Sequence, residues 1–220
     1  MKKYMLLVFS FLPVIVFCQG LGFGIKAGLN FANVTKASSI GNSSRTGFHA
    51  GLFLAPKSKG IIGSRTEVLF SRQGYNYKTS SNTGTVDLNY IMLPQYMAIN
   101  ITKYFTIMFG GQMAFLLNAK ADSTKTTTQG LPAGYDKMMS FYNRFDYGYG
   151  GGVEIHPVSG LVLGARINIS LGDLYKQPEA GQTPSFYPKV DVKNNVFMAY
   201  AGWVFGKKEK KEKKPKNDNQ

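Results

Sequence analysis

A two-residue alternation near the start of the chain is the feature that most constrains its fold. From Leu21 to Phe31 every odd position is apolar, and every even position is glycine or polar. Successive side chains of a β-strand point to opposite faces, so this segment would have one apolar face and one face of small and polar residues. A soluble sandwich strand would turn its apolar face inward and its charges outward, with fewer glycines. The pattern therefore favours a membrane barrel strand, with lipid outside and a narrow lumen inside.

The same alternation returns often enough to predict eight strands. They lie near residues 20–34, 45–56, 61–77, 86–101, 104–121, 144–156, 160–175 and 194–206. Most of these runs exceed the ~10 residues that a tilted transmembrane strand requires. The sequence thus predicts an all-β fold, a transmembrane antiparallel up-and-down β-barrel of about eight strands.

The predicted connections alternate in length. Short ones lie at 56–60, 101–103 and 157–160, and longer polar ones lie at 35–44, 78–85, 122–143 and 176–193. Bacterial outer-membrane barrels have short periplasmic turns and long extracellular loops, and an even number of strands returns the chain to the side where it started. The pattern predicts that the N- and C-termini are both periplasmic.

The N-terminus is typical of a secretory signal peptide. A basic region at positions 2–3 precedes an apolar run from Tyr4 to Phe17, which is shorter than the ~20 residues of a spanning helix. We expect residues 1–18 to be a signal peptide that is cleaved after Cys18. A lipidated Cys18 is the alternative, and Phe17 disfavours it because a lipoprotein signal has a small residue there.

Composition narrows the class of protein further. Charged residues make up 17% of the chain, against roughly a quarter in soluble domains. Cys18 is the only cysteine, so a cleaved chain has no disulfide, Cys–metal site or catalytic thiol. Of the net charge of +14, +4 comes from residues 207–220, which we expect to form a basic, disordered periplasmic tail beyond a barrel domain at 19–206. A contact of this tail with anionic lipid or an acidic partner is the alternative.

Four segments carry motifs whose order and spacing are shared with one family. They are Gly24 to Asn30, Arg65 to Ser71 followed by Gly74 and Tyr75, Leu88 to Pro94, and the closing Tyr200 to Phe205. Together they resemble the PorT-like outer-membrane β-barrel proteins, also called the porin family, over all of the chain between the signal and the tail. The resemblance implies an outer-membrane location, contact with the barrel assembly machinery and, for some members, a link to protein secretion. The lysine-rich extension after Phe205 departs from the family, which usually ends near that aromatic residue.

Five charged residues fall on the polar phase of their predicted strands: Lys26, Arg65, Glu67, Glu154 and Arg166. A charged channel or a catalytic cluster is one interpretation. The other interpretation is a structural lumen charge network. We expect this one, because side chains fill the interior of an eight-stranded barrel and buried charges have to be paired. Apolar residues on the opposite phase are expected to face lipid: Ile25, Leu29, Phe109, Phe115, Val153, Ile167 and Ile169.

Aromatic residues gather near the predicted strand ends, where interfacial girdles lie in membrane proteins. They are Phe31, Tyr75, Tyr77, Tyr90, Tyr104, Tyr142, Tyr175, Trp203 and Phe205. We interpret them as girdle residues, and ordinary core aromatics are the alternative.

No motif points to catalysis, a metal or a cofactor. The two histidines, His49 and His156, lack the spacing of a zinc site, and no Ser/His/Asp arrangement is visible. The glycines from 148 to 152 lack the lysine and the helix start of a phosphate-binding loop. We expect no cofactor and no enzymatic activity.

The two longest predicted loops contain apolar and aromatic residues that a solvated loop does not need. The candidate contact residues are Tyr135, Phe141, Phe186 and Tyr187. Because loops on a rigid scaffold often carry function, we expect a structural or interaction barrel that binds an extracellular ligand or partner. An accessory role in protein secretion, with a secretion-system partner, is the alternative. A small-solute pore is disfavoured by the narrow lumen. Outer-membrane lipid and the barrel assembly machinery are the other expected partners, and nucleic acid is not one.

Overall fold

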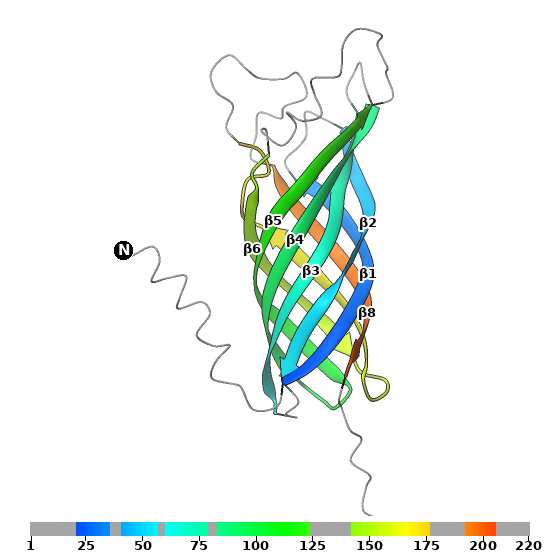
Figure 1. Cartoon of the computed structure of the whole chain (residues 1–220), viewed down its shortest axis with the longest axis vertical. Coiled ribbons are helices and arrows are strands. Elements are labelled where there is room, and N and C mark those ends of the chain that lie inside the picture. Colours follow the sequence, from blue (N-terminus) through cyan, green and yellow to red (C-terminus); the bar gives the residue numbers. More distant parts are fainter. Residues whose placement is uncertain are drawn as a thin grey trace, which may run out of the picture.

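Eight antiparallel strands close into one barrel within the part of the chain that the computed structural model describes, residues 21–35, 41–56, 60–78, 83–123, 142–176 and 192–205. They are β1 (Leu21–Thr35), β2 (Gly41–Pro56), β3 (Ile62–Lys78), β4 (Thr83–Asn100), β5 (Phe105–Ser123), β6 (Phe145–Ile155), β7 (Leu161–Ser170) and β8 (Lys193–Val204). Each strand pairs with its neighbours in the sequence, and β1 pairs with β8 to close the sheet (Figure 1). The predicted all-β, eight-stranded barrel is confirmed.

Side chains alternate between the interior and the outer wall. In β4 every even position from Gly84 to Ala98 is buried, while the odd positions are partly or fully exposed. On β5 the apolar outward residues run from Ile107 to Leu117. Ten residues that rise ~3.3 Å each on a strand tilted by ~40° cover about 25 Å, the height of the apolar band of outer-membrane barrels. The wall therefore matches the hydrocarbon core of a bilayer.

The residues expected to face lipid lie on the outer wall. Six of them have 41–53% of their surface exposed: Ile25, Leu29, Phe109, Phe115, Val153 and Ile167. Ile169 is partly exposed. The charged residues on the other phase lie inside. Four of them have at most 3% of their surface exposed: Lys26, Glu67, Glu154 and Arg166. The period of two therefore sorts apolar and charged side chains to opposite faces of the same strands.

Several strand ends differ from the prediction. β2 begins at residue 41 and β4 at residue 83, so residues 41–44 and 83–85, which were predicted to belong to long loops, are strand. β7 ends at residue 170 rather than near 175. Beyond the apolar band both faces of a strand can meet polar surroundings, so the alternation fades while the backbone ladder continues. In β2 and β4 the alternation thus marks the membrane-spanning part of the strand and misses its end.

Gly160, in the short turn between β6 and β7, has a backbone that favours glycine. Its φ is +91°, and an added Cβ would lie 2.9 Å from Cε2 of Trp203. We expect Gly160→Ala to lower the free energy of unfolding by about 1–2 kcal/mol, because L-residues resist the left-handed region. Urea unfolding in detergent micelles, followed by the fluorescence of the single tryptophan, measures the loss. Gly111→Ala is the control, since its Cβ would be 3.8 Å from the nearest heavy atom; equal losses in both variants would contradict the explanation.

Candidate functional site

The five charged residues predicted for the lumen lie in one layer of the interior, which we call the charged layer: Lys26, Arg65, Glu67, Glu154 and Arg166. It lies in the half of the barrel where β1 begins and β8 ends. Glu67 on β3 holds two cations, because its Oε1 accepts from Lys26 Nζ at 2.5 Å and its Oε2 accepts from Arg166 Nη1 at 2.6 Å. The side chains of all three are at most 1% exposed. One carboxylate thereby ties β1, β3 and β7 together across the lumen.

A second ion pair completes the charged layer. Arg65 Nη1 donates to Glu154 Oε1 at 2.7 Å, and the hydroxyl of Tyr200 donates to the same oxygen at 2.9 Å. These side chains come from β3, β6 and β8. Buried charges are tolerated when they are paired and hydrogen-bonded, and each carboxylate of the layer meets at least one guanidinium.

Aromatic rings fill the space beside the three cations. The pairs are Lys26 Nζ at 4.1 Å from the ring centre of Tyr200, Arg65 Cζ at 4.6 Å from that of Phe53, and Arg166 Cζ at 5.3 Å from that of Tyr96. A cation over an aromatic face is stabilised by the ring quadrupole. The rings were not among the residues predicted for the site, although their positions on the inward phase of β2, β4 and β8 were the signal that could have placed them there.

A chain of hydrogen bonds, which we call the polar layer, crosses the middle of the interior. Asn30 Nδ2 donates to Ser71 Oγ at 2.9 Å, and Asn30 Oδ1 lies 2.7 Å from His49 Nδ1. Gln73 Nε2 donates to Ser71 Oγ at 2.8 Å, and Asn194 Nδ2 donates to Gln73 Oε1 at 2.6 Å. The polar layer joins β2, β1, β3 and β8, and sequence reasoning did not predict it.

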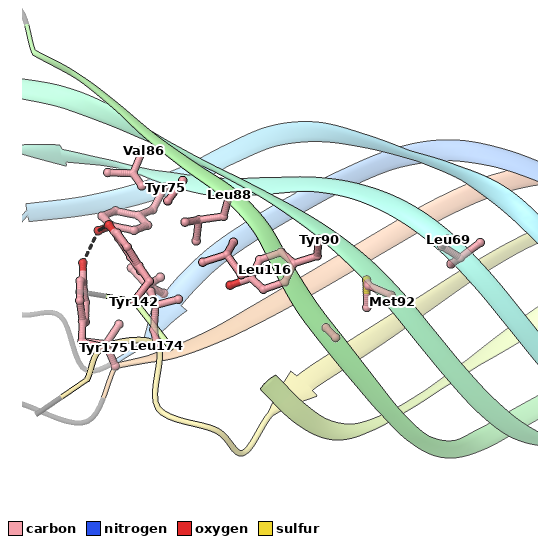
Figure 2. Close-up of a cluster of buried hydrophobic side chains, with 14 residues drawn as sticks. Leu69, Tyr75, Val86, Leu88, Tyr90, Met92, Leu116, Tyr142, Leu174 and Tyr175 are labelled. Atoms are coloured by element: carbon pink, nitrogen blue, oxygen red, sulfur yellow. Dashed lines mark hydrogen bonds between the residues drawn. The ribbon is translucent and has the colours of Figure 1, made fainter. Parts of the chain in front are cut away.

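Three tyrosines plug the interior at the end where the long connections begin. The hydroxyl of Tyr75 lies 3.1 Å from that of Tyr142 and is also hydrogen-bonded to that of Tyr175. Figure 2 shows these rings beside a cluster of apolar side chains that includes Leu88 and Leu116. All three tyrosines have at most 7% of their surface exposed. We call this group the tyrosine plug.

The girdle interpretation was wrong for half of the aromatic residues that the structure describes in full. Tyr75, Tyr90, Tyr142 and Tyr175 are buried inside, while Phe31, Tyr104, Trp203 and Phe205 are exposed. The buried tyrosines on strands occupy inward positions, and the other two lie on connections that enter the barrel mouth. The side chain of Tyr77 lies outside the described residues.

Backbone contacts hold the roots of two connections inside the mouth. Tyr142 and Tyr175 form an isolated antiparallel β-bridge. The amide of Asn143 donates to the carbonyl of Leu174 at 2.9 Å, and the amide of Leu174 donates to the carbonyl of Val192 at 2.9 Å. The roots of the β5–β6 and β7–β8 connections are therefore fixed to each other.

Within the described ranges, no three or more His, Cys, Asp and Glu residues are grouped so that they could hold a metal ion. The same part of the chain contains no helix long and apolar enough to cross a membrane. His49 belongs to the polar layer, and His156 Nε2 lies 3.8 Å from Glu154 Oε2.

Several predicted features lie outside the described residues. They are the signal peptide at 1–18, the candidate loop contacts Tyr135, Phe141, Phe186 and Tyr187, and the basic tail at 207–220.

The match to a protein-family model agrees with a membrane barrel. Residues 17–176 match the family model described as the outer membrane protein beta-barrel domain. No curated protein matches the sequence. One similar solved structure is Ail, the attachment invasion locus protein of Yersinia pestis, with 16% identity, 85% of this chain and 100% of that chain covered, and a TM-score of 0.47. Neisserial surface protein A has 11% identity, coverage of 84% of this chain and 99% of that chain, and a TM-score of 0.47. The outer membrane protein AlkL has 15% identity, coverage of 88% of this chain and 94% of that chain, and a TM-score of 0.43. Because the family model covers most of the chain, this protein belongs to the outer membrane protein beta-barrel domain family and is an integral outer-membrane barrel protein.

Proposed function

We propose that the protein is a non-conducting, non-enzymatic barrel that presents its long connections outside the cell, where they bind a ligand or partner. The observation that carries this proposal is the filling of the lumen at three successive levels, by the charged layer, the polar layer and the tyrosine plug. A channel needs an open path, whereas each of these levels joins side chains from several strands. Eight-stranded barrels are narrow enough for side chains to fill them.

The charged layer serves the fold rather than a reaction. Its carboxylates and cations are directed at each other, and the side chains of Lys26, Glu67 and Arg166 are at most 1% exposed. A catalytic acid or base has to reach its substrate, and these groups contact one another, the aromatic rings, the Tyr200 hydroxyl and Met198 Sδ. The five charged residues thus form a structural network that crosslinks the strands.

The same architecture supports the proposed orientation. The segments at 124–141 and 177–191 begin at the barrel end that carries the tyrosine plug, and short turns lie at the other end. Outer-membrane barrels direct long loops outward and short turns into the periplasm, which supports an orientation with periplasmic termini. The plug joins the roots of both long segments, which supports their action as one binding unit.

Shortening both long segments is the test of this proposal. In a strain that lacks the gene, a variant shortened within 124–141 and 177–191, with Tyr142 and Tyr175 retained, should fail to restore the wild-type profile of surface-bound and secreted proteins. Its barrel should still migrate in the heat-modifiable manner of a folded barrel. Removal of 207–220 is the control and should restore the profile.

Two results would change the assignment. Full restoration by the shortened variant, with loss of function after removal of 207–220, would place the working surface in the periplasm. A defect confined to exported proteins, seen with both variants, would favour the accessory role in secretion that the resemblance to PorT-like proteins implies.

A further inference from the structure

A cluster of charged side chains lies on the outer wall of β2–β5, toward the end that carries the tyrosine plug. Arg45 Nε donates to Asp87 Oδ1 at 2.5 Å, and Arg72 Nη2 donates to Asp87 Oδ2 at 2.5 Å. Lys120 on β5 is the register partner of Asp87 and is exposed. These four residues, which we call the arginine cluster, come from four adjacent strands, whose upper ends are seen in Figure 1.

The arginine cluster lies just beyond the apolar band. On β3, Arg72 follows the outward Phe70 by two residues, and the ring of Phe70 lies 5.9 Å from that of Phe48 on β2. Two residues correspond to about 7 Å along a strand. On β5, the exposed Leu117 precedes Lys120 by three residues. The cluster is therefore at the height where lipid headgroups meet the hydrocarbon core.

The geometry of the cluster prepares two guanidinium groups for an anion. Asp87 accepts from one nitrogen of each arginine and so holds the two like charges side by side. Arg72 keeps 44% of its side chain exposed and Arg45 keeps 26%. Three cations and one carboxylate leave a net charge of +2 at this point of the wall. The planar fork of a guanidinium matches the oxygen atoms of a phosphate, and such charge-assisted hydrogen bonds are the strong ones.

The described outward residues at the other end of the barrel show no such grouping. There Lys103 lies 4.8 Å from the ring centre of Tyr104, in the turn between β4 and β5. A single lysine over an aromatic ring is typical of an interfacial anchor. The difference between the two ends argues that the arginine cluster serves more than general solubility.

We infer that Arg45, Arg72 and Lys120 form a binding site for the phosphate groups of a phosphorylated lipid in the outer leaflet. Asp87 is a positioning residue that holds the two arginines together. The inference rests on the proposed orientation and makes it more specific, because it gives the wall of the barrel its own lipid ligand in addition to whatever the long connections bind.

Titration of the purified full-length protein in detergent micelles with bisphosphorylated lipid A tests the site. Arg45→Gln with Arg72→Gln should weaken binding about a hundredfold, because two charge-assisted hydrogen bonds are lost and each is worth about a factor of ten. The matched control is Lys103→Gln with Arg144→Gln, which removes the same charge from exposed positions elsewhere and should stay within about twofold of wild type. Lipid A without its phosphates should bind wild type no more tightly than the double arginine variant, which keeps Lys120, binds the intact lipid.

Heat-modifiable mobility verifies that each variant is folded. Retained affinity in the double arginine variant, an equal loss in the control pair, or equally tight binding of the phosphate-free lipid would each overturn the inference. Arg45→Lys with Arg72→Lys should recover part of the affinity, since lysine keeps the charge and loses the fork.

Orientation is tested separately, so that the two failures can be distinguished. In intact cells a membrane-impermeant maleimide should label Arg144→Cys and leave Thr102→Cys unlabelled, both positions being exposed at opposite ends of the barrel. The reverse labelling would overturn both the proposed function and the outer-leaflet site. The expected labelling together with unchanged lipid affinity in the double arginine variant would overturn the lipid site alone.

Discussion

Glu67→Gln is expected to lower the free energy of unfolding by about 3–5 kcal/mol, the range found when one partner of a buried ion pair is removed. Each oxygen of the Glu67 carboxylate holds one cation, Lys26 at 2.5 Å and Arg166 at 2.6 Å. An amide keeps the shape of the side chain but removes the charge that neutralises both. It also turns an NH₂ group toward a donor that needs an acceptor. The two cations would then remain in the interior without their shared counter-charge.

Urea unfolding in detergent micelles measures this loss, and Asp173→Asn is its control. Asp173 pairs with Lys193 at 2.5 Å, but its side chain is 48% exposed. Exposed ion pairs contribute only about 0–1 kcal/mol, so the same chemical change should have little effect there. If Glu67→Gln costs no more than Asp173→Asn, the charged layer is not a buried network.

Arg166→Met is expected to cost about 3 kcal/mol or more, because it leaves Glu67 with one cation and removes the guanidinium beside Tyr96. The informative comparison is the triple variant Lys26→Met, Glu67→Leu and Arg166→Met. It removes all charges of this part of the layer and keeps similar side-chain volumes. Replacing a complete buried ion network by apolar residues is often neutral or stabilising, so the triple variant should be more stable than either single variant.

The same unfolding experiment decides between two accounts of the charged layer. Recovery in the triple variant means that the single variants suffer from uncompensated charge. The alternative result is a triple variant whose loss of unfolding free energy equals the sum of the losses in the single variants. These side chains would then contribute specific contacts that apolar residues cannot replace, and the explanation by uncompensated charge would be wrong.

The two-residue alternation in the sequence predicted most of the fold. Lys26 lies between Ile25 and Ala27, and that local contrast was sufficient to place its side chain inside. The same parity applied to Glu67, Glu154 and Arg166, whose side chains lie in the charged layer. Partner choice could not be predicted in this way, because whether Arg166 meets Glu67 or Glu154 depends on register and on the stagger of strands around the barrel. Neither the register nor the stagger can be predicted from a single sequence.

The tyrosine plug contains one residue whose direction was predicted wrongly and two whose contact had no pattern in the sequence. Tyr75 has the parity of Arg65 and Glu67, so its inward direction was available from the pattern. Its position near a strand end nevertheless suggested a girdle. Tyr142 and Tyr175 lie outside the regular strands, and their bridge depends on two connections that fold back into the mouth. A contact between two connections leaves no periodic pattern in the sequence, so the bridge could not be predicted.

Single-channel recording from planar lipid bilayers that contain the purified full-length protein is the most direct test of the central claim that the lumen is closed by its own side chains. The charged layer, the polar layer and the tyrosine plug predict that the protein inserts without producing steady conductance steps, while an open porin added to the same bilayer does produce them. Heat-modifiable mobility of the reconstituted sample verifies that folded barrels are present. A steady, reproducible open conductance from the wild-type protein would contradict the account, because ions would then pass through all three levels.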